Sequence, residues 1–165
     1  KCCSSRKCLL MPKTPNRCCD GADGKPMTGH HLLPSKEFVA HVNRGSADAA
    51  TNYESDKAPC LCVEGHSHAL RTEHGQVGCN YTVERNAWLA NPANRGKAYT
   101  LAVGCEIGAK SAVGKVNVPP GATGCNKECL QKQLENGHQK MELTIKPNDP
   151  LPRAKQPPPA IVLDD

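Results

Sequence analysis

Two adjacent histidines, His30 and His31, lie in a short segment that can form an extended strand closed by Pro34. Successive side chains of a strand point to opposite faces, so the two rings cannot do the same job. One ring can bind a divalent metal ion while the other accepts a proton from water, because neutral imidazole is the strongest base available near pH 7. The pair therefore indicates metal-assisted hydrolysis.

A second group of histidines, His66, His68 and His74, follows later in the chain. The group comes after a predicted strand at residues 58–64, which alternates and is bounded by proline and glycine. This strand could pair antiparallel with the strand that carries the adjacent histidines. A strand with two histidines, a long loop, a second strand and a histidine-bearing helix is the order of elements in a ββα-metal nuclease site.

The motif around the adjacent histidines resembles a known family. The run TGHHLLP at residues 28–34 is followed by DKAPCLCVEG at 56–65 and by EHG at 73–75. Together these runs resemble the GHH-signature nuclease toxins of the HNH/endonuclease VII superfamily, over residues 18–80. Such domains are similar to the C-terminal toxins of bacterial polymorphic toxins, including DNase effectors that are fused behind a PAAR-type spike domain and delivered by type VI secretion.

The resemblance assigns roles to individual histidines. It implies that His30 is a metal ligand, that His31 is the general base that deprotonates the attacking water, and that His74 is a metal ligand from the helix. HNH sites commonly offer another histidine or asparagine one helical turn later, but Gly78 occupies that position here. His68 is then the first substitute for the third ligand, and the others are His66, Glu73 and Asn80.

The chemistry implied by the resemblance is hydrolysis of phosphodiester bonds in DNA. A divalent ion, with Mg²⁺ as the first choice and Zn²⁺, Mn²⁺ or Ni²⁺ as alternatives, offsets the charge that develops on the phosphate and the leaving oxygen. Candidate nucleic-acid contacts, which hold phosphates without reading sequence, are Arg71, Lys36 and Arg44. Arg85 and Arg95 are further candidates for this role.

The resemblance also implies partners and a place of action. Such a toxin acts in the cytoplasm of a rival bacterium, and its producer needs a cognate immunity protein. The chain has 21 Lys plus Arg and 16 Asp plus Glu, a net charge of +5, which favours an acidic surface on that inhibitor. We expect a monomeric toxin domain, fused to a PAAR-type delivery domain, and no membrane span because no apolar run reaches about 18 residues.

Composition predicts a thin hydrophobic core that is supported by cysteines. The 165 residues include 14 Gly, 14 Pro and 11 Cys, but only one Trp, one Phe and three Tyr. A domain short of apolar side chains commonly uses cystines or metal ions for stability. We therefore expect an α+β fold with a small ββα-metal (HNH-like) nuclease core at about residues 29–80, cysteine-rich loops and additional helices.

The chain is predicted to divide into three parts. Residues 1–28 form a cysteine-rich, irregular loop segment, residues 29–145 the HNH-like nuclease toxin domain, and residues 146–165 a proline-rich tail that is an extended strap or disordered. Within the domain, a short helix begins at Ser35. The other expected elements are helices at 77–89 and 125–134, a helix or strand within 97–118, and a strand at 141–145.

The cysteines leave other functions open. Disulfides suit a protein that leaves its cell, and an odd number of thiols means that at least one is unpaired or ligated. A Cys/His hydrolase could use one thiol as nucleophile and a motif histidine as base. A non-catalytic structural-zinc module could use Cys60, Cys62, His66 and His68. A metalloprotease and a nucleoside deaminase are disfavoured because the chain contains neither HExxH nor HxE.

Overall fold

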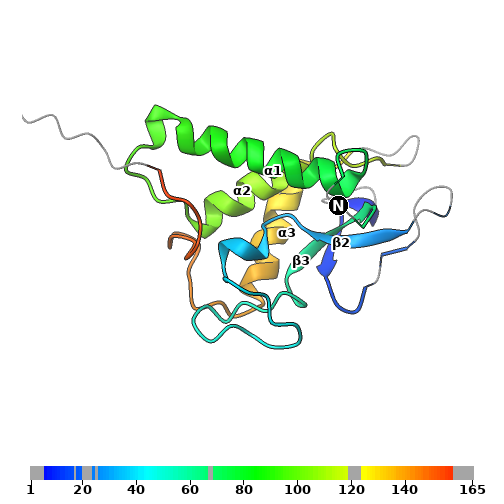
Figure 1. Cartoon of the computed structure of the whole chain (residues 1–165), viewed down its shortest axis with the longest axis horizontal. Coiled ribbons are helices and arrows are strands. Elements are labelled where there is room, and N and C mark those ends of the chain that lie inside the picture. Colours follow the sequence, from blue (N-terminus) through cyan, green and yellow to red (C-terminus); the bar gives the residue numbers. More distant parts are fainter. Residues whose placement is uncertain are drawn as a thin grey trace, which may run out of the picture.

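The structure of the protein is a computed structural model, and its described residues form a small antiparallel sheet and three α-helices (Figure 1). The structure describes residues 6–16, 18–19, 24, 26–66, 69–118 and 124–157. This architecture confirms the α+β fold class predicted from the sequence. Among the described helices, none combines the length and the apolar character needed to cross a membrane.

The sheet has three strands in the order β1-β3-β2. They are β1 (Leu10–Pro12), β2 (Met27–His31) and β3 (Pro59–Glu64), and both pairings are antiparallel. The predicted strands of the histidine motif and of residues 58–64 are confirmed. The expectation of an irregular N-terminal segment is wrong, because β1 belongs to that segment and pairs with the central strand. The strand was missed because its three residues are too few to show a hydrophobic period.

The central strand β3 sets the register of the histidine strand. The first five residues of β3 are buried, and the strand is paired on both edges. His30 lies opposite Leu61, and His31 lies opposite Cys60. Gly29 approaches β3 closely, because a Cβ atom at this position would lie 3.2 Å from the Cβ atom of Cys60. A larger residue at position 29 would crowd the central strand beside the histidines.

Three helices pack beside the sheet: α1 (Glu73–Ala90), α2 (Leu101–Ala112) and α3 (Lys127–Gln139). Helix α2 lies between the other two and packs against both (Figure 1). The residue before each helix caps it, because its side-chain oxygen accepts a hydrogen bond from a backbone N–H of the first turn. The capping residues are Thr72, Thr100 and Asn126.

The helices confirm most of the predicted helical segments. Helix α1 contains the predicted segment 77–89, begins four residues earlier and ends before Asn91 and Pro92. The apolar region 97–118, which the sequence left open between helix and strand, contains α2. Helix α3 lies over most of the predicted segment 125–134 and continues beyond it. The described 3-10 helices are η1 (Arg6–Cys8), η3 (Ser35–Glu37) and η4 (Pro92–Asn94).

Helix α2 lies against the residues that follow the histidine pair. A Cβ atom at Gly108 would lie 2.8 Å from the carbonyl oxygen of Leu32, so glycine is needed for this approach. Gly104 leaves similar room for the side chain of Leu33. Both leucines are buried. This packing connects the end of β2 directly to the helical layer.

The predicted strand at residues 141–145 is wrong. The chain turns back directly after α3, and Glu142 adopts a positive φ of 52°, which a strand residue does not have. Thr144 then donates its backbone N–H to the carbonyl of Thr51 at 3.1 Å, in a loop. The alternating side chains at 141–145 therefore pack on the core from turns and bends.

The structure describes the proline-rich tail as far as residue 157. Leu151 is buried, and its N–H donates to the carbonyl of Tyr99 at 3.0 Å. The N–H of Arg153 donates to the carbonyl of Glu37, also at 3.0 Å. These bonds fasten this part of the tail to the core, and the chain passes through turns at residues 147–148 and 152–153 and is not an extended strap. Residues 158–165 lie outside the described residues.

The core concentrates the few aromatic side chains of the protein. The single Phe, Phe38, and the three Tyr residues are buried, and Phe38 stacks on Tyr53 with ring centres 4.3 Å apart. Disulfides join Cys8 to Cys125 and Cys18 to Cys62. Cys129 is also disulfide-bonded. The expectation that cystines support a thin core is thus confirmed.

Candidate functional site

The rings of His30 and His74 meet in the structure. His30 is a buried residue of the edge strand β2, and His74 is the second residue of α1. Their ring centres lie 4.4 Å apart, and the ring planes are inclined by 84°. The fold therefore brings the histidine motif and the first turn of the following helix to one place.

The separation of these two rings is one that two ligands of the same divalent ion can have. With metal–nitrogen bonds of about 2.1 Å, two histidines on one ion have ring centres about 5 Å apart. The 4.4 Å between His30 and His74 is close to that value. Within the part of the chain that the structure describes, no group of three His, Cys, Asp or Glu side chains could hold an ion. His68, the predicted third ligand, lies outside the described residues.

His31 has a different environment from its neighbour. Its Nε2 atom lies 2.9 Å from the carbonyl oxygen of Ser55. Because a carbonyl oxygen can only accept, Nε2 carries the proton and donates it, and the neutral ring keeps a lone pair on Nδ1. The ring of His31 can therefore accept one proton at a defined atom, Nδ1.

The ring of His31 is uncharged at pH 7. Burial lowers the pKa of His31 to about 4, against the opposing effect of the hydrogen bond to Ser55. The positive charge of Lys13 lowers the pKa of His31 further, and the negative charge of Asp56 raises it.

The Ser55 carbonyl is a part of the site that sequence reasoning missed. A backbone atom has no residue-type signal, so only the fold reveals its role. The loop that presents Ser55 is anchored by Asp56, which accepts hydrogen bonds from the N–H of Gly45 at 2.8 Å and the hydroxyl of Thr14 at 3.0 Å. These two bonds hold the pKa of Asp56 below its usual value. Asp56 therefore fixes the conformation of the loop whose Ser55 carbonyl contacts His31.

The other residues considered as a third ligand have separate surroundings. The carboxylate of Glu73 accepts hydrogen bonds on both oxygens, as described below. Asn80 donates its side-chain amide to the carbonyl of Ser111 at 3.0 Å and thereby holds α1 against α2. His66 is exposed. The third ligand of the predicted metal site therefore stays a prediction.

The basic residues predicted to hold phosphates fall into two groups. Arg71, Lys36 and Arg44 are exposed, and Arg71 stands in the turn just before α1. Arg95 is exposed as well. Arg85 differs, because its Nη1 atom lies 2.8 Å from Oε1 of Glu37, a carboxylate that is almost fully buried. The charge of Arg85 therefore balances Glu37, and its contact with phosphate stays a prediction.

Comparison with known proteins identifies the family. Residues 27–138 match the family described as GHH signature containing HNH/Endo VII superfamily nuclease toxin 2. The chain belongs to this family of nuclease toxins. It is also 32% identical over 154 residues to the DNase toxin Tse7 of Pseudomonas aeruginosa, an alignment that covers 84% of this chain and 36% of that relative. The chain thus spans about a third of the length of this curated relative. No solved structure matches the chain.

The buried cysteines of this GHH-family toxin do not suit the alternative functions. A structural zinc site at Cys60 and Cys62 conflicts with the disulfide between Cys62 and Cys18. A thiol nucleophile must ionise, but burial raises the pKa of Cys60 and of Cys105 to about 12. These buried thiols are protonated at pH 7, as structural cysteines are.

Proposed function

We propose that this GHH-family toxin is a metal-dependent endonuclease that hydrolyses phosphodiester bonds of DNA in rival bacterial cells. The observation that carries the proposal is the contact between the rings of His30 and His74, with His31 next in the chain. The identity of 32% to a DNase toxin supports DNA as the substrate. Membership of a nuclease toxin family supports hydrolysis as the reaction.

His30 and His74 hold the divalent ion through ring nitrogens in this proposal, and His68 is the proposed third ligand. Bound there, the ion offsets the negative charge that develops on the scissile phosphate and the leaving oxygen. Imidazole must be neutral to bind a metal, so protons compete with the ion. Mg²⁺ is the first candidate for the ion, and Zn²⁺, Mn²⁺ and Ni²⁺ are the alternatives.

His31 acts as the general base. Its Nδ1 atom takes the proton of the attacking water, while Nε2–H remains on the carbonyl of Ser55. The Ser55 carbonyl keeps the ring in one tautomer and stabilises the imidazolium that forms. A bound phosphodiester adds negative charge beside the ring, which raises the low pKa of His31 toward the working pH.

Exposed basic residues near the motif serve as phosphate contacts. Arg71, Lys36 and Arg44 carry their charges at the surface, where they can bind the DNA backbone without reading its sequence. Each phosphate neutralised in this way contributes a slope of about −0.9 to the dependence of log affinity on log salt. Binding of DNA should therefore weaken steeply as salt is added.

Delivery and control follow the biology of secreted toxins in this proposal. The chain is the toxin part of a longer protein with a PAAR-type domain, leaves its producer by type VI secretion and acts as a monomer in the target cytoplasm. A cognate immunity protein protects the producer. We expect its binding surface to be acidic, because the toxin has a net charge of +5. A pull-down from producer cells should recover a stoichiometric inhibitor.

The deciding experiment is incubation of the purified chain with plasmid DNA and with RNA under separate divalent ions. We expect cleavage of the plasmid with at least one of Mg²⁺, Mn²⁺, Zn²⁺ and Ni²⁺, and no cleavage in the presence of a chelator. Nicking of closed circular plasmid shows an endonuclease, since no free end is needed. Cleavage of RNA alone contradicts the assigned substrate, and cleavage that persists in the chelator contradicts the metal.

A further inference from the structure

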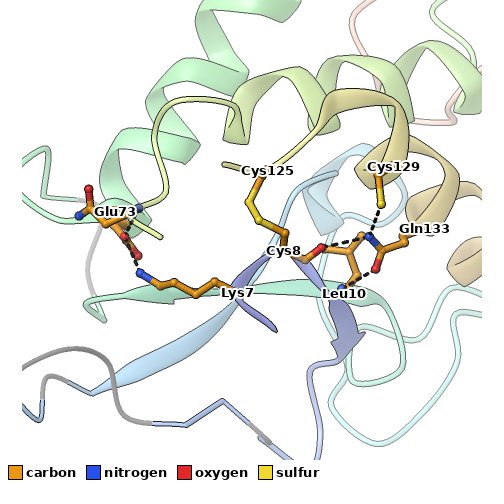
Figure 2. The surroundings of a disulfide bond; sticks show 8 residues. Lys7, Cys8, Leu10, Glu73, Cys125, Cys129 and Gln133 are labelled. Carbon is orange, nitrogen blue, oxygen red and sulfur yellow. Dashed lines mark hydrogen bonds and ion pairs between the residues drawn. A yellow bond between two sulfur atoms is a disulfide. The ribbon is translucent and has the colours of Figure 1, made fainter. Parts of the chain in front are cut away.

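Glu73, the residue before His74, has a carboxylate that accepts hydrogen bonds on both oxygens (Figure 2). Lys7 Nζ lies 2.7 Å from Oε1, and the backbone N–H of Asn117 donates to the same oxygen at 2.6 Å. The backbone N–H of Glu64 donates to Oε2 at 2.8 Å. The residue is 4% exposed. The carboxylate therefore joins η1, the end of β3 and the connection after α2 to the first turn of α1.

We propose that Glu73 is a positioning residue for the metal ligand His74. The inference rests on the proposed function and deepens it. Glu73 and His74 are the first two residues of α1, so the bonds that fix the Glu73 side chain also fix the backbone that carries the His74 ring. A negative charge at a helix N-terminus adds to the stability of this turn. Movement of the turn would carry the His74 ring away from His30, which it contacts.

The Cys8–Cys125 disulfide keeps Lys7 within reach of α1 (Figure 2). Cys8 follows Lys7 in the chain, and its carbonyl accepts a hydrogen bond from the side-chain amide of Gln133 at 3.0 Å. The N–H of Leu10 donates to the same side chain at 2.9 Å. One covalent bond and two hydrogen bonds thus attach the N-terminal segment to the region of α3, and Lys7 extends from that segment to the carboxylate.

A glutamine at position 73 cannot reproduce the arrangement. A carboxylate accepts on both oxygens, whereas an amide offers one accepting oxygen and one donating NH2 group. In one orientation the NH2 group faces the N–H of Glu64, and in the other it faces Lys7 and the N–H of Asn117. Either way at least one donor loses its acceptor, so the first turn of α1 is no longer held in one position.

The test measures Mn²⁺ binding to metal-free protein by titration calorimetry in the wild type, Glu73→Gln and Glu128→Gln. Glu128 is a matched control, because it is an exposed glutamate in the first turn of α3. Mn²⁺ is the probe because it binds weakly to thiols, two of which, Cys19 and Cys79, are exposed. Substitution of a residue that orients a metal ligand typically weakens metal binding about 10–100-fold. We expect this loss in Glu73→Gln and no change in Glu128→Gln.

A second measurement separates positioning from a general loss of structure. The ring resonances of His74 in the NMR spectrum of the metal-free protein should shift or broaden in Glu73→Gln. The ring resonances of His41, which is exposed in a distant segment of the sequence, should stay in place. Shifts of equal size at both histidines overturn the positioning role, since they report a change throughout the protein.

Lys7→Gln keeps the proposal testable if Glu73→Gln does not fold. This variant removes the cation but leaves the backbone donors of Glu64 and Asn117, so Mn²⁺ affinity should fall less than in Glu73→Gln. Lys7→Arg should restore the affinity. Wild-type affinity in Glu73→Gln overturns the positioning role, and if Glu73→Gln does not fold, wild-type affinity in Lys7→Gln does so. A wild-type protein that neither binds Mn²⁺ nor cleaves DNA overturns the proposed function instead.

Discussion

The ring of His30 meets the ring of His74 edge to face, with 4.4 Å between the ring centres. One residue belongs to an edge strand of the sheet and the other to the first turn of a helix, so the pair forms only when both elements have packed. An ion bound between the two rings would therefore bind the folded state and not the unfolded chain. Metal affinity and stability should be linked.

Replacing His74 by alanine should weaken metal binding and remove the stabilisation that metal provides. With a saturating ion at 100 times its Kd, the linkage contributes about 2.7 kcal/mol, which raises the midpoint of thermal unfolding by several degrees. We expect this rise in the wild type and a much smaller one in His74→Ala. The measurement is thermal unfolding with and without Mn²⁺. His41→Ala, at an exposed loop histidine, should behave as the wild type.

His31→Ala should lose activity while it keeps the metal. General-base catalysis is typically worth about 10²–10⁴-fold, so plasmid cleavage should fall by a factor in this range. Mn²⁺ affinity should stay within about twofold of the wild type, since His31 is not a proposed ligand. Single-turnover cleavage and calorimetry on the same preparation measure both quantities. Loss of metal binding in His31→Ala would make His31 a ligand and would leave the base unassigned.

Removing Arg85 should destabilise the protein strongly. Arg85→Met leaves the carboxylate of Glu37 buried without its partner, which typically costs about 3–5 kcal/mol. Lys110→Met is the matched control, because Lys110 pairs with Glu84 at the surface and such pairs contribute about 0–1 kcal/mol. Urea unfolding measures both free energies. Equal small losses would show that Arg85 does not balance a buried charge.

Stability should fall as the pH is lowered from about 6.5 to about 4 because of His138. Its Nδ1–H donates to the carbonyl of Leu134 at 2.9 Å, and the sulfur of Cys105 lies 3.9 Å from the same nitrogen. Burial lowers the pKa of His138 from 6.5 to about 4, against the opposing effect of the hydrogen bond to Leu134. The pKa of His138 is lower in the folded protein than in the unfolded chain. Between these two pKa values the unfolded chain binds a proton that the folded protein does not bind, so lowering the pH favours unfolding.

The loss of stability through His138 should reach at most about 3 kcal/mol at pH 4. His31 has a lowered pKa too and adds to the slope with the same sign. Urea unfolding at pH 7.5 and at pH 4.5 measures the difference, and His138→Asn should make it smaller. An unchanged pH dependence in His138→Asn would show that other groups carry it.

Breaking the Cys8–Cys125 disulfide should destabilise the protein. The two cysteines are 117 residues apart, and loss of a native disulfide typically costs about 2–5 kcal/mol. The double variant Cys8→Ser/Cys125→Ser should lower the thermal midpoint accordingly. Cys79→Ser changes an exposed free thiol on α1 and should leave the midpoint where it is. A double variant as stable as the wild type would show that non-covalent contacts hold the N-terminal segment without the disulfide.

Local signals predicted the elements that carry the motif. The alternation and flanking proline and glycine of residues 58–64 indicated β3, and the helix predicted at residues 77–89 proves to be part of α1. The same kind of signal failed at residues 141–145, where alternating side chains have no neighbouring strand to pair with. It also missed β1, because three residues are too few to show a period.

The amino-acid sequence by itself determined the residue types at the site and their order along strand, strand and helix, because these depend on local spacing and propensity. Only the tertiary structure decided that the rings of His30 and His74 are in contact. It also decided that the carbonyl of Ser55 accepts a hydrogen bond from His31 and that Arg85 pairs with the buried Glu37. It likewise placed Lys7, from the N-terminal segment, next to Glu73 at the start of α1. Such contacts depend on how distant segments pack, and no local pattern encodes a distance between them.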